Sequence, residues 1–236
     1  MNKFVKKAAV AATVALAFSA SAFAQTAIAP GQTLNNSGGA LNNFDSLANI
    51  IASEVNSFAS NTGSFTGEVG SYVSVGDALN PYGLGALTFS YFFHNDATSD
   101  DAIERMSVNN FKGFQTSVAY TTFYTDTQFQ RATRSNNGNV VGAEWSLVGG
   151  GGGILPGTVN SYGFDSASSY GQLVIYTNAT NYGQGLASFI DGGVGSTAAY
   201  TPAAAVPEPE TYALMMAGLG LMGFVARRRK QQNTAA

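Results

Sequence analysis

Apolar and polar residues alternate in short runs along the middle of the chain. In residues 87–93 every second position is leucine or an aromatic residue: Leu87, Phe89, Tyr91 and Phe93. Thr88, Ser90 and Phe92 take the opposite side. A period of two is typical of a β-strand, whose successive side chains point to opposite faces of the sheet. The alternation recurs in residues 104–108, 114–120 and 141–147, which we therefore also expect to be strands.

One later segment is apolar on both faces, because Leu173 and Ile175 oppose Val174 and Tyr176. This predicts a strand in the centre of a sheet. Turn-forming residues separate the runs: Asn80-Pro81-Tyr82-Gly83, Asn109-Asn110, Asn136-Asn137-Gly138 and Asp191-Gly192-Gly193. About seven or eight short strands in a domain of this size predict an all-β fold, an antiparallel β-sandwich of the jelly-roll or immunoglobulin-like kind.

Two segments depart from this alternation. Near residues 41–59, apolar residues recur at spacings of three and four: Leu41, Phe44, Leu47, Ile51, Val55 and Phe58. This spacing predicts a short amphipathic helix, with a first strand over residues 50–58 as the alternative. The second segment is the glycine run at 149–153, which lacks the lysine of a phosphate-binding loop and is interpreted as a flexible loop.

The N-terminus has the form of a secretory signal. Three lysines precede an apolar helical run at residues 8–18, and Ala22-Phe23-Ala24 then supplies small residues at the cleavage positions. Cleavage is predicted between Ala24 and Gln25. The signal helix is therefore left out of the expected fold of the mature protein.

The C-terminus combines three features in a short space. Pro207, Glu208 and Pro209 precede an uncharged apolar run at 212–226, and a basic cluster follows at Arg227, Arg228, Arg229 and Lys230. As a helix the apolar run would be about 22 Å long, short of the ~30 Å hydrocarbon core of a bilayer. The cations would keep the extreme C-terminus in the cytoplasm and leave the preceding domain outside. An ordinary membrane anchor after a proline-rich linker is the alternative interpretation.

These three features, in this order, resemble the PEP-CTERM sorting signal of bacterial proteins. The resemblance implies handling by an exosortase, a membrane-embedded cysteine protease, after export by the Sec machinery. It implies an inner-membrane anchor on the periplasmic side before processing and a location at the cell surface or outside it afterwards. It also associates the protein with exopolysaccharide.

The expected division of the chain follows from these signals: signal peptide (1–24), N-terminal lead-in segment (25–63), β-sandwich domain (64–200), Pro/Ala linker with the Pro-Glu-Pro motif (201–211), short transmembrane segment (212–226) and basic cytoplasmic tail (227–236). Parts of the 85–200 region also resemble uncharacterised PEP-CTERM proteins, on the stretches 87–91, 104–105, 113–114, 137–142, 177–180 and 190–194. That resemblance implies an extracellular β-sandwich and assigns no catalytic residue.

Charge narrows the choice of partners. Seven of the eleven cations lie in the two terminal signals, so the mature region has four cations against twelve acidic residues, a net charge of −8. A domain this acidic would repel nucleic acid and anionic lipid surfaces. The chain has no cysteine, which excludes disulfides and thiol catalysis.

Only one acidic cluster suggests a ligand. Oxygen ligands at Asp96, Thr98, Asp100, Asp101 and Glu104 are the type that calcium prefers. The spacing is not that of an EF-hand, since no mid-loop glycine is present. Calcium is the one cofactor that the sequence suggests, and a solvated acidic loop is the alternative.

Enzyme signatures are weak. His94 is the only histidine, and no Gly-x-Ser-x-Gly elbow accompanies it. A glycosidase pair would use Glu144 with Asp126 or Asp165. We therefore expect a protein without enzymatic activity, with a secreted hydrolase as the remote alternative.

Aromatic residues raise a second function, because exposed rings can stack on sugars. The candidates are Tyr72, Tyr82, Tyr120, Tyr124, Trp145, Tyr162, Tyr170 and Tyr182. Trp145 shares a predicted strand face with Val141 and Leu147 and is expected in the core. The sequence thus predicts a surface or extracellular-matrix protein, with a lectin-like carbohydrate-binding module as the alternative.

Overall fold

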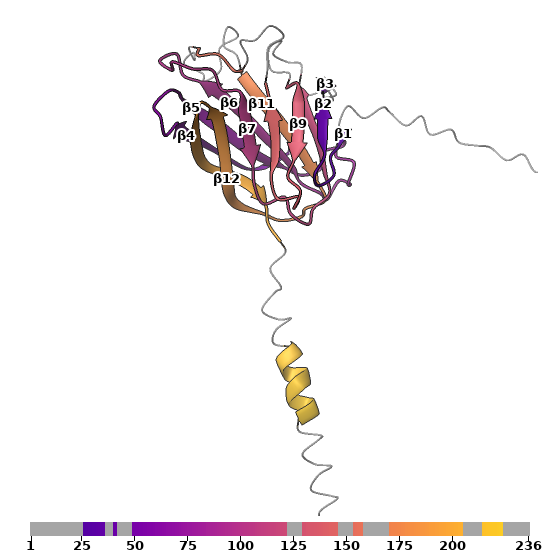
Figure 1. Ribbon diagram of the computed structural model, residues 1–236. Coiled ribbons are helices and arrows are strands. Elements are labelled where there is room, and N and C mark those ends of the chain that lie inside the picture. The colour runs from indigo at the N-terminus through magenta and orange to yellow at the C-terminus, as the bar shows by residue number, and fades with distance from the viewer. Residues whose placement is uncertain are drawn as a thin grey trace, which may run out of the picture.

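The computed structural model describes residues 26–35, 40–41, 49–121, 129–145, 153–157, 170–204 and 214–223. Its strands form two sheets that pack face to face (Figure 1). The predicted all-β sandwich is confirmed. Outside the sandwich, residues 214–223 form a short helix.

The first sheet has seven strands, in the order β1-β8-β11-β6-β5-β4, with β3 beside β8. These are β1 (Thr26–Ala27), β3 (Ala40–Leu41), β4 (Ile50–Ala59), β5 (Thr66–Ser74), β6 (Thr88–Asn95), β8 (Thr116–Thr121) and β11 (Tyr170–Thr177). All pairs along the path are antiparallel, whereas β3 pairs with β8 in parallel.

The second sheet has six strands, in the order β13-β12-β7-β10-β9-β2, and every pair is antiparallel. These are β2 (Thr33–Asn35), β7 (Arg105–Val108), β9 (Arg131–Arg134), β10 (Val141–Glu144), β12 (Tyr182–Asp191) and β13 (Gly193–Pro202). The expected lead-in segment (25–63) thus supplies β1, β3 and β4 to one sheet and β2 to the other.

The core between the sheets follows the predicted alternation. Phe89, Tyr91 and Phe93 of β6 are completely or almost completely buried on the inner face. The Phe93 ring meets the Trp145 ring edge to face at a centroid distance of 5.0 Å. Trp145 is buried, which confirms its expected place in the core.

The opposite face of the first sheet is also covered. Ala119, Val174 and Tyr176 form a second apolar cluster, against which Leu79 and Tyr82 pack from the loop between β5 and β6. This explains why β11 is apolar on both faces, as the sequence predicted for a central strand.

The helix expected near 41–59 was wrong for its C-terminal half, where the alternative was right. Residues 50–59 form β4, which pairs with β5 along its length. Ile51 and Val55, expected on the buried stripe, are 47% and 61% exposed. Serine, asparagine and valine have low helix propensity, and the β4–β5 ladder satisfies the backbone of the strand. Residues 42–48, including Phe44 and Leu47, lie outside the described residues.

The predicted turns contain the backbone conformations that their residues favour. Gly83, Asn110, Gly138 and Gly192 all have positive φ, between 58° and 109°. Glycine and asparagine adopt this left-handed region most readily. Local turn chemistry was therefore visible in the sequence.

Candidate functional site

The C-terminal segment is described only in part. Residues 214–223 form a helix whose side chains are all exposed. The motif residues and the basic cluster lie outside the described residues: Pro207, Glu208, Pro209, Arg227, Arg228, Arg229 and Lys230. The cleavage residues Ala22, Ala24 and Gln25 lie outside them as well.

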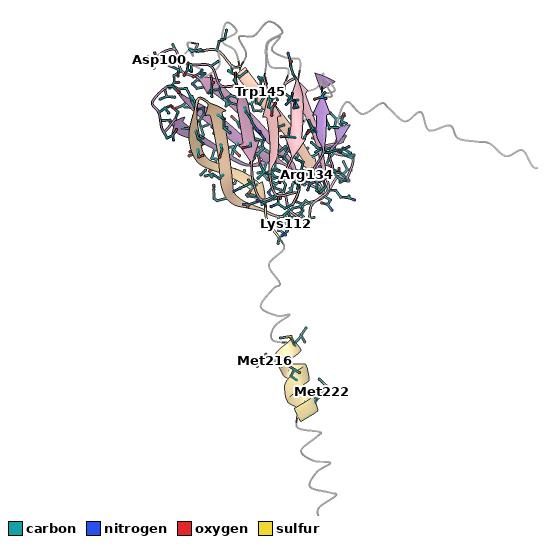
Figure 2. All side chains as sticks on the ribbon, viewed as in Figure 1. Asp100, Lys112, Arg134, Trp145, Met216 and Met222 are labelled. Atoms are coloured by element: carbon teal, nitrogen blue, oxygen red, sulfur yellow. The ribbon has the colours of Figure 1, made fainter. Side chains whose placement is uncertain are left out.

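The described helix is shorter than the apolar run. Ten residues of α-helix measure about 15 Å, half the thickness of a bilayer core. Within the described ranges, no helix has both the length and the apolar character needed to cross a membrane. Met216 and Met222 lie on this helix, apart from the sandwich (Figure 2).

The sandwich ends immediately before this segment. Strand β13 ends at Pro202, and the Ala203 amide donates a hydrogen bond to the Asn181 carbonyl at 3.0 Å. Up to Ala204, where the described part of the sandwich ends, Ala203 is therefore the last residue hydrogen-bonded to the fold. Little chain separates it from Pro207, so the sandwich and the motif are adjacent parts of one chain.

A polar depression of 520 Å³ opens beside β4, β5, the end of β6 and β13. Its polar lining consists of Ser57, Thr66, Glu68, Asp96 and Ser196. Ser57 Oγ donates to Glu68 Oε1 at 3.4 Å. The depression therefore presents hydroxyl and carboxylate groups, with no cation among the residues that line it.

Asp96 is held firmly in this depression. His94 Nε2 lies 3.1 Å from Asp96 Oδ1, and Thr66 Oγ1 donates to Asp96 Oδ2 at 2.7 Å. Thr66 and Asp96 are also hydrogen-bonded through their backbones, because the Asp96 amide donates to the Thr66 carbonyl at 2.9 Å. The histidine side chain is 8% exposed and that of the aspartate 38%. Both carboxylate oxygens of Asp96 thus have protein partners, which fixes the end of β6 against the start of β5.

Two of the other calcium candidates are held by backbone hydrogen bonds. The amides of Asp100 and Asp101 both donate to the Ser64 carbonyl, at 2.9 and 3.1 Å. Burial, and then the nearby carboxylates of Glu104 and Asp101, raise the pKa of Asp191. In the described parts of the chain, no three histidine or acidic side chains are grouped so as to hold a metal ion. A calcium site stays a prediction from the sequence alone.

The candidate glycosidase carboxylate has structural partners. Glu144 lies between two arginines on the outer face of the second sheet, with Arg105 Nη1 3.5 Å from Oε1 and Arg131 Nη1 3.1 Å from Oε2. Its proposed companions Asp126 and Asp165 lie outside the described residues. The described structure therefore brings no second carboxylate to Glu144.

The candidate aromatic residues whose side chains are described do not form a flat platform. The exposed Tyr182 meets Tyr200 at a centroid distance of 5.4 Å and an interplanar angle of 89°. Tyr72 and Tyr82 are half-buried. For Tyr120, Tyr124, Tyr162 and Tyr170, the side chains lie outside the described part of the structure. The described tyrosines thus offer one perpendicular pair, unlike coplanar rings that stack on a sugar.

Sequence reasoning singled out Asp96 but not the other polar residues that line the depression. Ser57, Thr66, Glu68 and Ser196 come from three strands and carry no shared motif. Strand register brings them together, since Ser57 pairs with Glu68, which pairs with His94. Only pairing information, absent from a single sequence, would have revealed this group.

These features define an all-β domain followed by a separate C-terminal segment. Comparison with known families gives that segment its identity, since residues 205–230 match the PEP-CTERM protein-sorting motif. The chain therefore carries a signal for exosortase-dependent sorting, which implies export and processing at the membrane. No curated protein and no solved structure matches the chain.

Proposed function

We propose that this chain is an exported, non-enzymatic component of the cell surface or extracellular matrix, associated with exopolysaccharide. The sorting motif at residues 205–230 carries the proposal. It begins two residues after Ala203, which is the last of the described residues of the sandwich with a backbone hydrogen bond to it. Cleavage near the motif would therefore release or transfer the whole sandwich without cutting a strand.

Charge and composition support an exported location. The basic cluster at 227–230 would retain the tail end in the cytoplasm while the sandwich lies outside. The absence of cysteine suits a compartment where free thiols are oxidised. The extensive apolar core lets the sandwich fold without disulfides.

Intact mass and fractionation of the native protein test the proposal. We expect a mature species that begins at Gln25, ends near Val206 and leaves the membrane fraction. In a variant with Pro207→Ala, Glu208→Ala and Pro209→Ala, we expect the unprocessed tail to be retained. Glu210→Ala is the matched control, since it removes a neighbouring carboxylate outside the triplet.

One outcome would contradict this proposal directly. If the native protein keeps Arg227 through Lys230 and stays in the membrane, the tail acts as a plain anchor.

A carbohydrate-binding module is the second candidate, supported by the polar depression. Glu68 and the fixed Asp96 present carboxylate oxygens, which accept hydrogen bonds from sugar hydroxyls, and Ser57 and Ser196 add hydroxyl groups. Affinity electrophoresis in gels containing soluble polysaccharides tests this function. We expect retardation of the native protein that Glu68→Gln weakens and Asp100→Asn leaves unchanged. Equal mobility with and without polysaccharide would eliminate the module.

A further inference from the structure

The two ends of the sandwich differ in the charge of their loops. One end, here called the exit end, consists of the loops at 28–32, 75–87, 109–115, 135–140 and 178–181, together with Ala203, where the chain leaves the fold. The opposite end, here called the far end, includes the loops at 60–65 and 96–104 and Gly192. Figure 2 shows Lys112 at the exit end and Asp100 at the far end.

The far end is strongly acidic, whereas the exit end exposes no carboxylate in its described loops. Asp96, Asp100, Asp101, Glu104 and Asp191 lie at the far end. The exit end contains one acidic residue, Asp77, which is 4% exposed and accepts hydrogen bonds from the Leu79 amide and the Thr88 hydroxyl. The net charge of −8 calculated for the mature region therefore does not apply to the exit end, whose described loops expose no negative charge.

Lys112 is the exposed cation of the exit end. It stands in a tight turn, where the Phe114 amide donates to the Phe111 carbonyl at 3.2 Å and Gly113 has a φ of 87°. Arg134 Nη2 holds both carbonyls of this turn, at 2.9 Å from Phe111 O and 2.8 Å from Phe114 O. The turn is thus fixed to the core and presents Lys112 to solvent.

Leu84 is exposed at the same end of the sandwich, in a second ordered loop. Its side chain is 64% exposed, although its own carbonyl accepts a hydrogen bond from the Gly76 amide at 2.9 Å. Asn80 fixes the base of the loop, because Asn80 Nδ2 donates to the carbonyls of Leu87 and Thr177. This ordered loop therefore holds an apolar side chain in solvent at the exit end.

Aromatic side chains complete this end. Tyr182 begins β12 opposite Pro202, the last residue of β13, and its ring packs against Tyr200. Tyr182 remains 39% exposed. Tyrosine and lysine are favoured where a protein meets the headgroup region of a bilayer.

The short linker between the sandwich and the C-terminal helix indicates which partner this surface contacts. Ten residues, 204–213, separate Ala203 from the helix at 214–223, a distance of at most about 35 Å when fully extended. When the apolar segment is inserted, the exit end must stay near the lipid surface. We propose that the exit end of the sandwich docks on that lipid surface, with Leu84 and Tyr182 at the apolar boundary and Lys112 at anionic headgroups. This inference rests on the proposed function through the inserted tail.

Site-specific fluorescence on the full chain tests the docking. The chain has no cysteine, so Thr180→Cys at the exit end and Thr98→Cys at the far end give matched single labels. The labelled protein is reconstituted in vesicles of equal parts phosphatidylcholine and phosphatidylglycerol that contain a headgroup-linked quencher. We expect strong quenching at position 180 and little at position 98.

Two substitutions on the Thr180→Cys background separate the contributions of charge and apolar contact. Lys112→Gln should lower the ratio of docked to undocked protein about fivefold on anionic vesicles, and have no effect on pure phosphatidylcholine. Leu84→Ser should lower it about tenfold on both. Equal quenching at positions 180 and 98 would overturn the docking.

Trypsin added outside the vesicles reports separately on the tail. Protection of Arg227 through Lys230 shows that the tail is inserted, so protection combined with equal quenching rejects docking and leaves the sorting proposal intact. Cleavage at these residues would show that the tail does not cross the bilayer, which rejects the inserted tail on which the docking depends.

Discussion

Arg134 of β9 joins the two sheets through Thr116 of β8, because Arg134 Nη1 donates to Thr116 Oγ1 at 2.8 Å. The guanidinium is buried, and all its N–H groups donate hydrogen bonds to uncharged oxygen atoms. The other acceptors are the carbonyls of Ile28, Phe111, Phe114 and Gly138. Burial lowers the pKa of Arg134, yet a guanidinium stays protonated in a protein. One side chain therefore stabilises two segments. The first is the segment around Ile28, where the chain passes from β1 in the first sheet to β2 in the second, and the other is the turn that carries Lys112.

Replacing this side chain should weaken the whole sandwich. Arg134→Met should lower the free energy of unfolding by about 3–5 kcal/mol, because several buried carbonyls lose their donor. Arg134→Lys should fall between Arg134→Met and the native protein, since an ammonium keeps the charge but has fewer donors. Urea unfolding followed by tryptophan fluorescence measures both. A loss below about 1 kcal/mol for Arg134→Met would show that the network is dispensable.

Tyr91 provides a second link between the sheets. Its hydroxyl donates to the Tyr200 carbonyl of β13 at 2.6 Å from within the core. We expect Tyr91→Phe to cost about 1–2 kcal/mol, because the carbonyl loses a buried donor. Tyr176→Phe is the matched control, since the Tyr176 hydroxyl is buried without a partner among the described residues. Equal losses in the two variants would refute the role of this hydrogen bond.

The same tyrosine makes stability sensitive to high pH. Burial, and secondarily the charge of Glu54, raises the pKa of Tyr91 well above its ordinary value. The unfolded state therefore loses this proton first, and the folding free energy that depends on it declines as pH rises above about 10. Urea midpoints measured from pH 8 to 11 should fall more steeply for the native protein than for Tyr91→Phe. Parallel curves would contradict the assignment to Tyr91.

The sequence revealed the features that depend on neighbouring residues. The alternation of Phe89, Tyr91 and Phe93 located β6, and the asparagine and glycine turns marked the ends of strands. It failed at β4, because the spacing of Ile51, Val55 and Phe58 suits a helix and only pairing with β5 decides for a strand. The C-terminal motif was recognisable because it is a contiguous signal.

Features assembled from distant residues could not be predicted in the same way. The partners of Arg134 come from loops and strands far apart in the chain, so nothing near it in the sequence marked it as buried. The depression around Asp96 depends on the register of β4, β5 and β6. The charge difference between the ends likewise appears only when the strands are oriented, since the sequence alone shows an acidic domain.

We expect the Asp191 carboxylate at the acidic far end to lower the free energy of unfolding slightly at neutral pH. Burial and the neighbouring carboxylates of Glu104 and Asp101 raise the pKa of Asp191, so its ionised form is disfavoured in the folded state. The folding free energy linked to this group is fully present below its unfolded pKa of about 3.9 and is lost as pH rises through the higher folded value. Asp191→Asn should therefore stabilise the protein at pH 7, by less than about 1 kcal/mol because solvent screens a partly exposed group.

The size of this gain should depend on pH and on Asp101. At pH 3 the carboxyl is protonated in both states, so Asp191→Asn should then change the unfolding midpoint little. Asp101→Asn should also stabilise the protein at pH 7, and the double variant should gain less than the sum of the two single changes, because the repulsion between them can be removed only once. Thermal unfolding of the four proteins at pH 7 and pH 3 measures these differences. Strict additivity at pH 7 would show that Asp191 and Asp101 do not interact, and the instability would then arise from burial of Asp191 and from Glu104.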